Sequence, residues 1–210
     1  MISSDNLLLE TAFNIFNRVY FKNGLPKVII TIQSSPKAYG YITVHKVWKD
    51  NQDSYHEINI SAEHLSRNIE NVLATLMHEM VHLYCMVNNV SDTSNGGRYH
   101  NKRFKEEAEK RDLIIEYVKY IGYSKTAPSD RFIEVIRENG LCASIEHCRT
   151  SGNCLVPPTT GGDSDDNGNL AKKKTSTRKY LCSSCGISVR ATKDINIICG
   201  DCMYTMIKVG

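Results

Sequence analysis

The sequence lacks long apolar runs, and no stretch of it approaches the roughly 18 residues that a membrane-spanning helix needs. Its first six residues, MISSDN, also lack the basic start and apolar core of a secretory signal peptide. The net charge of +3 is too small to indicate a nucleic-acid partner by itself. We therefore expect a cytoplasmic protein without a membrane partner, and association with the nucleoid is compatible with that expectation.

Apolar residues are also scarce between about positions 150 and 179, where Gly, Ser, Thr, Pro, Asp and Lys predominate. A segment of this composition cannot bury enough apolar surface to fold. The rest of the 210 residues suffices for one domain with its own core and a small metal-stabilised one. We predict a catalytic domain at 1–140, a flexible linker at 141–179 and a small domain at 180–210.

The most informative motif is H-E-x-x-H, formed by His78, Glu79 and His82 within an apolar segment of helical periodicity, residues 68–87. Spacing of i and i+4 places both imidazoles on one helix face, about 5–6 Å apart, so that they can share a metal ion. Glu79 then lies beside the ion and can accept a proton from a water that zinc has acidified. The alternative is a core helix with two ordinary histidines, but burying such groups unpaired costs about 1–3 kcal/mol each. The motif predicts a zinc hydrolase.

A catalytic zinc site usually has a third protein ligand. The metzincin pattern would place a histidine six residues after His82, but that position is Asn88, which excludes this class. His100 is the preferred candidate, because it follows a glycine-containing loop and opens the next predicted helix, 101–112. Glu106 and Glu107 are the alternatives.

Four parts of the chain carry a family resemblance: residues 16–21 with Leu25 and Pro26, then 56–61, 74–82 and 99–104. Together they resemble the SprT-like family, which includes bacterial SprT and the eukaryotic protease Spartan. The resemblance implies a metalloprotease-like domain with His78, His82 and His100 as zinc ligands and Glu79 as the catalytic base. In Spartan-type members the substrates are proteins crosslinked or tightly bound to DNA. A C-terminal zinc ribbon also recurs in the family.

Two C-x-x-C pairs lie near the C-terminus, and 13 residues separate them. Their members are Cys182, Cys185, Cys199 and Cys202. Four thiolates at this spacing can surround one zinc ion and leave no position for water, which is typical of a structural zinc ribbon. Gly186 and Gly200 suit the tight turns at such sites. Between the pairs, residues 187–192 and 195–198 are predicted to form strands. A disulfide-linked hairpin is the alternative, and it would need an oxidising compartment.

The predicted ribbon is basic and has Tyr180 and Tyr204 available for stacking, so a nucleic-acid contact is one interpretation. The other is a folding module that docks a partner or the catalytic domain. Outside the ribbon, Cys142, Cys148 and Cys154 lack metal-ligand spacing and are interpreted as free thiols. Cys85 is interpreted as a small core residue.

The remaining pattern predicts a scaffold of helices and a small sheet. We expect a helix capped by Asp5 and ending near 22, strands at 28–32, 39–44 and 57–60, an extended or helical piece at 113–120, and a helix at 130–138. One of the three strands could bind an extended peptide by edge pairing. Trp48 is interpreted as a surface-packing residue.

Taken together, the sequence predicts an α+β zincin-like domain followed by a zinc ribbon, with one catalytic and one structural Zn²⁺. The expected reaction is peptide-bond hydrolysis with Glu79 as base, on protein substrates associated with or crosslinked to DNA. The alternative function is a non-proteolytic, zinc-binding adaptor or regulator associated with nucleic acid. Glu79 argues against that alternative, because a purely structural site has no need of a base beside the ion.

Overall fold

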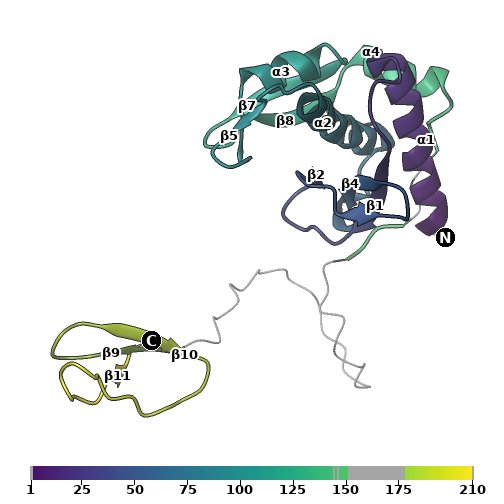
Figure 1. Ribbon diagram of the computed structural model, residues 1–210. Coiled ribbons are helices and arrows are strands. Elements are labelled where there is room, and N and C mark those ends of the chain that lie inside the picture. Colours follow the sequence, from purple (N-terminus) through teal and green to yellow (C-terminus); the bar gives the residue numbers. More distant parts are fainter. Residues whose placement is uncertain (1, 144, 146, 151–177, 210) are drawn as a thin grey trace, which may run out of the picture. The chain divides into compact units, whose positions relative to one another are not determined.

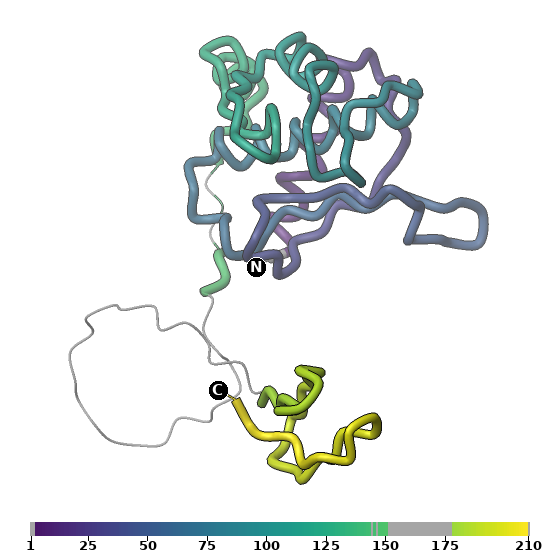
Figure 2. The backbone as a smooth tube through the Cα atoms, turned by 90° about the vertical axis from the view of Figure 1, so that its left-hand side faces the viewer, coloured from purple at the N-terminus to yellow at the C-terminus, as the bar shows by residue number. Residues whose placement is uncertain are grey.

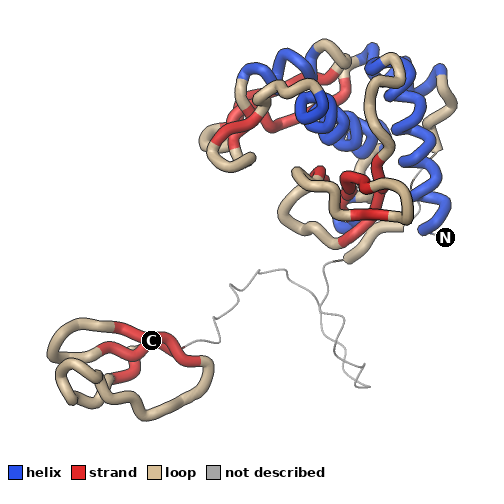
Figure 3. The backbone as a smooth tube through the Cα atoms, in the orientation of Figure 1, coloured by secondary structure: helices blue, strands red, loops and turns tan. Residues whose placement is uncertain are grey.

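The computed structural model describes residues 2–143, 145, 147–150 and 178–209, which belong to two compact units, 1–155 and 156–210 (Figure 1). The first unit mixes helices and small sheets, and the second is a small three-stranded sheet (Figure 3). The predicted α+β class is therefore confirmed. Within the described residues, no helix combines the length and apolarity that crossing a membrane requires.

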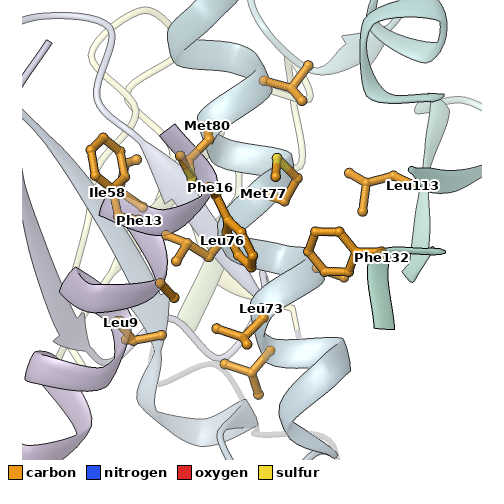
Figure 4. Packing of buried hydrophobic residues seen from close by; sticks show 14 of the residues in the cluster. Leu9, Phe13, Phe16, Ile58, Leu73, Leu76, Met77, Met80, Leu113 and Phe132 are labelled. Carbon is orange, nitrogen blue, oxygen red and sulfur yellow. The ribbon is translucent and has the colours of Figure 1, made fainter. Parts of the chain in front are cut away.

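Two long helices pack against each other in the first unit. Helix α1 spans Ile2–Phe21 and helix α2 spans Ile69–Val87, which confirms the helix predicted at 68–87. Apolar residues recur every three or four positions in both, so each buries a continuous stripe. Figure 4 shows Phe16 of α1, Leu76 of α2 and Phe132 packed together, and the Phe16 and Phe132 ring centroids are 5.1 Å apart.

The predicted N-terminal boundary of α1 is wrong. Asp5 lies inside the first turn and is buried, whereas a capping residue would precede the helix. Its carboxylate accepts from His147 Nδ1 at 2.9 Å. No local pattern indicates this contact, because the two residues are far apart in the chain.

The first sheet has the order β1-β4-β2, with β3 also paired to β4. The strands are β1 (Val28–Gln33), β2 (Gly40–Ile42), β3 (Trp48–Lys49) and β4 (Ser54–Ser61). β1 runs parallel to β4 and β2 runs antiparallel to it. The three predicted strands are therefore present, while β3 was not predicted. Ile30, Ile58 and Ile60 bury one face of the sheet against the helices.

The other face of this sheet carries a buried carboxylate. Glu57 accepts hydrogen bonds from Thr31 Oγ1 at 2.8 Å and from Trp48 Nε1 at 2.6 Å, and Gln33 and Tyr41 also donate to it. Trp48 thus packs at the surface, as expected, and also fastens β3 to β4. The hairpin of β3 and the start of β4 extends away from the rest of the unit (Figure 2).

The second sheet has the order β5-β6-β8-β7 and lies on the opposite side of α2 (Figure 1). Its strands are β5 (Thr93–Ser94), β6 (Tyr99–His100), β7 (Leu113–Val118) and β8 (Gly122–Pro128). The piece at 113–120 is therefore a strand, and β8 was not predicted. Helix α3 spans Lys102–Glu109, and helix α4 spans Asp130–Glu138 as predicted, with the Ser129 side chain capping it.

The described residues that follow α4 contact the rest of the first unit. Leu141 is buried, and the Arg149 backbone amide donates to the Ala62 carbonyl at 2.8 Å. The start of the linker predicted at 141–179 is thus anchored where it is described. Residues 151–177 of that linker lie outside the described residues.

The second unit is a sheet with the order β10-β9-β11. Its strands are β9 (Arg178–Leu181), β10 (Ser188–Ala191) and β11 (Ile207–Lys208), all antiparallel. β10 matches one predicted strand. The other, at 195–198, is wrong, because that segment contributes only an isolated bridge between Ile198 and Thr205.

Candidate metal centre

Three histidines converge in the first unit, on the side of α2 that faces the second sheet. His78 and His82 come from adjacent turns of α2, and His100 comes from β6. The Nε2 atom of His78 is 3.2 Å from that of His82 and 3.2 Å from that of His100, and the His82 and His100 Nε2 atoms are 3.1 Å apart. These three residues form a group that can hold a metal ion.

The geometry of this group fits zinc. Three nitrogens bound tetrahedrally to zinc at about 2.0–2.1 Å lie about 3.3–3.4 Å apart, close to the separations observed. His82 Nδ1 contacts the Asp92 carboxylate at 2.5 Å. Because a carboxylate only accepts, this contact assigns the proton to Nδ1 and leaves a lone pair on Nε2, as a metal ligand requires.

Contacts on the far side of each ring fix two of the histidines. Thr126 Oγ1 of β8 lies 2.7 Å from His78 Nδ1, and Asp92 holds His82. Asp92 is itself placed by the Asn101 amide, which donates to its carbonyl at 3.0 Å. Sequence reasoning did not identify Asp92 or Thr126. Metal-binding histidines commonly donate to a carboxylate, but nothing in the spacing of the chain indicates which acid it is.

His100 is held by its backbone. It pairs with Thr93 of β5 and with Gly122 of β8, and its amide donates to the Ile121 carbonyl at 3.0 Å. A side chain at Gly122 would not fit, because an added Cβ would lie 2.1 Å from the His100 carbonyl oxygen. His100 was expected at the start of a helix, whereas it lies in a strand just before α3.

A phenylalanine closes the apolar side of the group. Phe104 of α3 is fully buried, and its ring centroid lies 4.5 Å from that of His78, 4.6 Å from His82 and 4.8 Å from His100. Because each imidazole contacts the Phe104 ring, Phe104 restricts the orientation of all three.

Burial also sets the protonation of these groups. It lowers the pKa of His78 well below its usual value and lowers that of His100 to about 4, with neighbouring histidines acting in the same direction. Both rings are therefore neutral at pH 7, the form that binds metals. Burial raises the pKa of Glu79 to about 7, although His82 acts in the opposite direction.

Glu79 lies against the first sheet. A Cβ added at Gly40 of β2 would be 3.3 Å from Glu79 Oε1 and 3.0 Å from Thr75 Cγ2. The absence of a side chain at Gly40 therefore leaves space for the carboxylate between α2 and β2.

The alternatives for the third ligand do not join the group. Glu106 is exposed, and Glu107 pairs with Lys110 at 2.7 Å and Arg111 at 2.8 Å. Both acids lie outside the metal-holding group that His100 completes.

Two cavities open on this site. One, of about 170 Å³, touches His78 and Glu79 and is walled by Gly40 on one side and by Ser124–Thr126 on the other. The second, of about 370 Å³, touches all three histidines and is walled by residues 40–42 together with Met86 and Asp92. The site is thus an accessible cleft rather than a closed structural centre.

A family model of SprT-like proteins matches residues 9–118, which is more than half of the chain and includes all three histidines and Glu79. The chain belongs to the SprT-like family. Searches among curated proteins and among solved structures gave no match. The expected resemblance is thereby confirmed, and the histidine group lies within the SprT-like domain.

The second unit carries the other metal-holding group. Its members are Cys182, Cys185, Cys199 and Cys202, and their Sγ atoms all lie within 4.8 Å of one another. The Cys185 and Cys199 sulfurs are 3.6 Å apart, far beyond a disulfide bond of about 2.05 Å and close to the spacing around a tetrahedral zinc. All four thiols are free. This arrangement fits a zinc ribbon.

Two matching turns present the sulfurs. The Gly186 amide donates to the Cys182 carbonyl at 3.0 Å, and the Met203 amide donates to the Cys199 carbonyl at 2.8 Å. Gly186 has a φ of 75° and Met203 a φ of 59°. Gly200 lies inside the second turn, as expected, while the left-handed position there belongs to Met203, one residue after Cys202.

The tyrosines of the ribbon differ in exposure. Tyr180 is buried with Cys182, Cys199 and Met206, so the expectation that it is available for stacking is wrong. Tyr204 is exposed.

The remaining cysteines form no site in the described part of the chain. Cys85 is buried in the core as expected, and Cys142 and Cys148 are exposed free thiols. Cys154 lies outside the described residues.

Proposed function

We propose that the SprT-like domain is a zinc-dependent peptidase. The observation that carries the proposal is the convergence of three Nε2 atoms within 3.2 Å of one another beside a buried carboxylate, Glu79, in an open cleft. A structural centre needs neither the carboxylate nor the cleft. His78, His82 and His100 would hold the ion, which leaves one coordination position for substrate or water.

Zinc at this position would polarise the scissile carbonyl and lower the pKa of a bound water to about 7. Glu79 accepts the proton of the attacking water on its carboxylate and delivers it to the leaving amine. Asp92 and Thr126 hold the imidazoles of His82 and His78 in the ligating orientation.

We further propose that the substrates are proteins associated with or crosslinked to DNA, and that the ribbon, stabilised by a structural zinc, contributes to DNA contact. Membership of the SprT-like family supports the first point. The charge pattern of the ribbon supports the second. Lys179 of β9 lies directly opposite Arg190 of β10, and both are exposed.

Two like charges opposite each other on a sheet destabilise it, so an anionic partner would relieve the repulsion. Asp194 of the ribbon is already paired with Arg178 and Lys208. Phosphate groups of nucleic acid are suitable partners for the exposed pair.

The direct test compares the wild type with Glu79→Gln, with zinc content measured in both, on β-casein and on a protein crosslinked to single-stranded DNA. We expect equal zinc, and a loss of cleavage by about 10²–10⁴-fold in the variant, which is the usual contribution of a general base. DNA should stimulate the wild type. Cleavage that DNA does not affect would leave the peptidase standing and contradict the DNA-related role.

The ribbon is tested with Lys179→Gln/Arg190→Gln. We expect weaker DNA binding and a shallower salt dependence. Lys208→Gln is the control, because that charge is already paired with Asp194.

If a zinc-loaded wild type cuts no protein, with or without DNA, the non-proteolytic adaptor replaces the peptidase as the better account.

A further inference from the structure

The two walls of the smaller cavity differ in chemistry. Glu79, the proposed base, lies on the side of β2, where Gly40 leaves space for its carboxylate. The other wall is formed by Ser124, Lys125 and Thr126 of β8. β2 and β8 belong to different sheets on opposite sides of α2 (Figure 1). A donor on the β8 wall therefore faces the base across the space in which a scissile bond would lie.

Ser124 lies on β8 between the contacts that this strand makes with two of the histidines. Two residues before it, Gly122 pairs with His100. Two residues after it, Thr126 Oγ1 lies 2.7 Å from His78 Nδ1. Two residues of a strand span about 6.4–6.8 Å, so the Ser124 backbone is close to both contacts.

A β-bulge sets the direction of the Ser124 side chain. The register of the two strands shifts so that one residue of β7, Tyr117, lies opposite two residues of β8, Tyr123 and Ser124. Bulges re-aim side chains and are common beside active sites. After the bulge the side chains alternate, so Lys125 points to the exposed face while Ser124 shares the face of Thr126. The Ser124 side chain therefore points towards the metal-holding group, in agreement with its place in the cavity wall.

The Ser124 hydroxyl is not committed to another contact. Ser124 is partly buried, and within the described part of the chain its hydroxyl has no hydrogen-bond partner. The other side chains of this wall are engaged, since Thr126 Oγ1 contacts His78 and Lys125 Nζ donates to the Glu116 carboxylate at 2.7 Å. The hydroxyl can therefore donate to a group that enters the cavity.

The remaining hydroxyl groups that line this cavity are held elsewhere. Thr75 Oγ1 donates to the Asn71 carbonyl at 3.1 Å and accepts from Arg67 at 3.1 Å. The Tyr39 ring packs on Arg67 and on His64, neither of which lines the cavity. The available donor opposite the base is therefore the serine of β8.

We propose that Ser124 is a catalytic residue of the proposed peptidase, and that its hydroxyl donates a hydrogen bond to the oxyanion of the tetrahedral intermediate. This inference rests on the proposed function and adds a residue to its site. The water oxygen bonds to the carbonyl carbon while Glu79 takes the proton, and the π electron pair of the carbonyl moves to its oxygen. When that pair returns, the C–N bond breaks and the amine leaves with the proton from Glu79. Ser124 keeps its own proton throughout.

A donor of this kind acts mainly on the rate of the chemical step. The carbonyl oxygen gains its full negative charge only as the intermediate forms, so the hydrogen bond is stronger there than in the bound substrate. We expect Ser124→Ala to lower kcat by about 10²–10³-fold, with little change in KM, on a peptide that spans the preferred wild-type cut in β-casein. Ser94→Ala, at an exposed serine of β5 in the same sheet, is the matched control and should change neither. An unchanged kcat overturns the inference, and so does a loss that lies in KM.

A second measurement does not depend on turnover. N-phosphoryl-leucylalanine carries a tetrahedral phosphoryl group that resembles the intermediate, and N-acetyl-leucylalanine is its planar counterpart. With zinc-loaded protein, we expect Ser124→Ala to bind the phosphoryl dipeptide about 10²–10³-fold more weakly than the wild type and the acetyl dipeptide equally well. Equal affinity of the two proteins for the phosphoryl dipeptide, or an equal loss for both ligands, overturns the inference.

Zinc content separates a catalytic role of Ser124 from a structural one. We expect Ser124→Ala to keep as much zinc as the wild type. If that variant does not fold, Ser124→Cys replaces it in both measurements, because a thiol fills the place of the hydroxyl but is a weak donor. Loss of zinc in both variants overturns the inference.

The two measurements also separate this inference from the peptidase proposal. If the zinc-loaded wild type cuts no protein, the peptidase proposal fails, whereas the comparison of the two dipeptides still decides whether Ser124 binds the tetrahedral group. If the wild type neither cuts protein nor binds the phosphoryl dipeptide, both proposals fail.

Discussion

At the scale of single residues, metal binding depends on the partners of the Nδ1 atoms as well as on the imidazoles themselves. Asp92 is buried and holds His82 Nδ1, while Thr126 holds His78 Nδ1. Removing such a partner from a metal-binding histidine typically costs 10–100-fold in metal affinity. Neither residue belongs to a sequence motif, and both reach the histidines only through the tertiary structure.

We predict that Asp92→Asn weakens zinc binding at the histidine group by about 10–100-fold, because the amide does not provide the charge that stabilises the ligating tautomer. Competition with a chelator measures the affinity. Asp50→Asn, an equivalent change in an exposed turn, is the control and should leave it unchanged. Equal zinc affinity in wild type and Asp92→Asn would contradict the role of Asp92.

A second residue-scale prediction concerns acid stability. Glu63 accepts from Ser34 Oγ at 2.5 Å, from the Ser35 amide at 2.9 Å and from Ser61 Oγ at 3.0 Å, and these bonds lower its pKa to about 2. A carboxyl group with a lowered pKa stabilises the fold above its usual pKa of about 4.5, and the stabilisation is lost as the pH falls towards 2.

The measurement is the free energy of unfolding of wild type and Glu63→Gln between pH 7 and pH 2. We expect the wild type to be the more stable at pH 7 and the difference to shrink from about pH 5 downward. A difference that stays constant across this range would show that the ionised carboxylate is not what stabilises the contact.

At the scale of elements, the position of His100 depends on the contact between β6 and β8. Gly122 has a φ of 75° and touches the His100 backbone so closely that a Cβ would lie 2.1 Å from its carbonyl oxygen. We predict that Gly122→Ala displaces β6 and lowers zinc affinity. Gly96→Ala is the matched control, since it has a φ of 66° in the same region but open space around it.

Both variants share the cost of a left-handed backbone, about 1–3 kcal/mol, but only Gly122→Ala adds the collision. Chelator competition and thermal unfolding together separate the two effects. Equal zinc affinity in the two variants would mean that the β6–β8 contact does not position His100.

The elements that the sequence predicted well are those with long, regular periodicity. α2 repeats apolar residues over its whole length, and α4 has a capping Ser129 and a terminating Gly140. The missed elements have no such signal. β3, β5 and β6 contain two residues each, and β8, with the sequence GYSKTAP, is strand because β7 pairs with it.

The same division holds for the site. His78, Glu79 and His82 follow from one short motif, because a helix fixes their geometry locally. His100 reaches the site only because the chain reverses in the loop before it. The glycines of that loop indicated the reversal, but the pairing of β6 with β5 and β8 is what positions His100. Asp92 and Thr126 could not be found, because their positions depend on how two sheets pack on α2. Tyr180 was misjudged for a related reason, since nothing local distinguishes a ribbon core residue from an exposed one.

At the scale of the whole molecule, the chain combines two units with separate cores and separate metal-holding groups. Each group is built within its own unit, from three histidines in the first and four cysteines in the second. Loss of one ion should therefore leave the other bound. Under the proposed function, the first unit carries the chemistry in its open cleft, and the four thiols of the second unit hold a structural ion.

The most direct test of the central claim is the zinc content of the full chain, measured by elemental analysis in wild type, His100→Ala and Cys199→Ser. Our account predicts two ions in the wild type and one in each variant. His64→Ala is the control and should keep two, because His64 lies outside both groups and its ring contacts the Pro36 carbonyl and the Tyr39 ring instead. Two ions bound to His100→Ala would contradict the three-histidine site on which the proposed function rests.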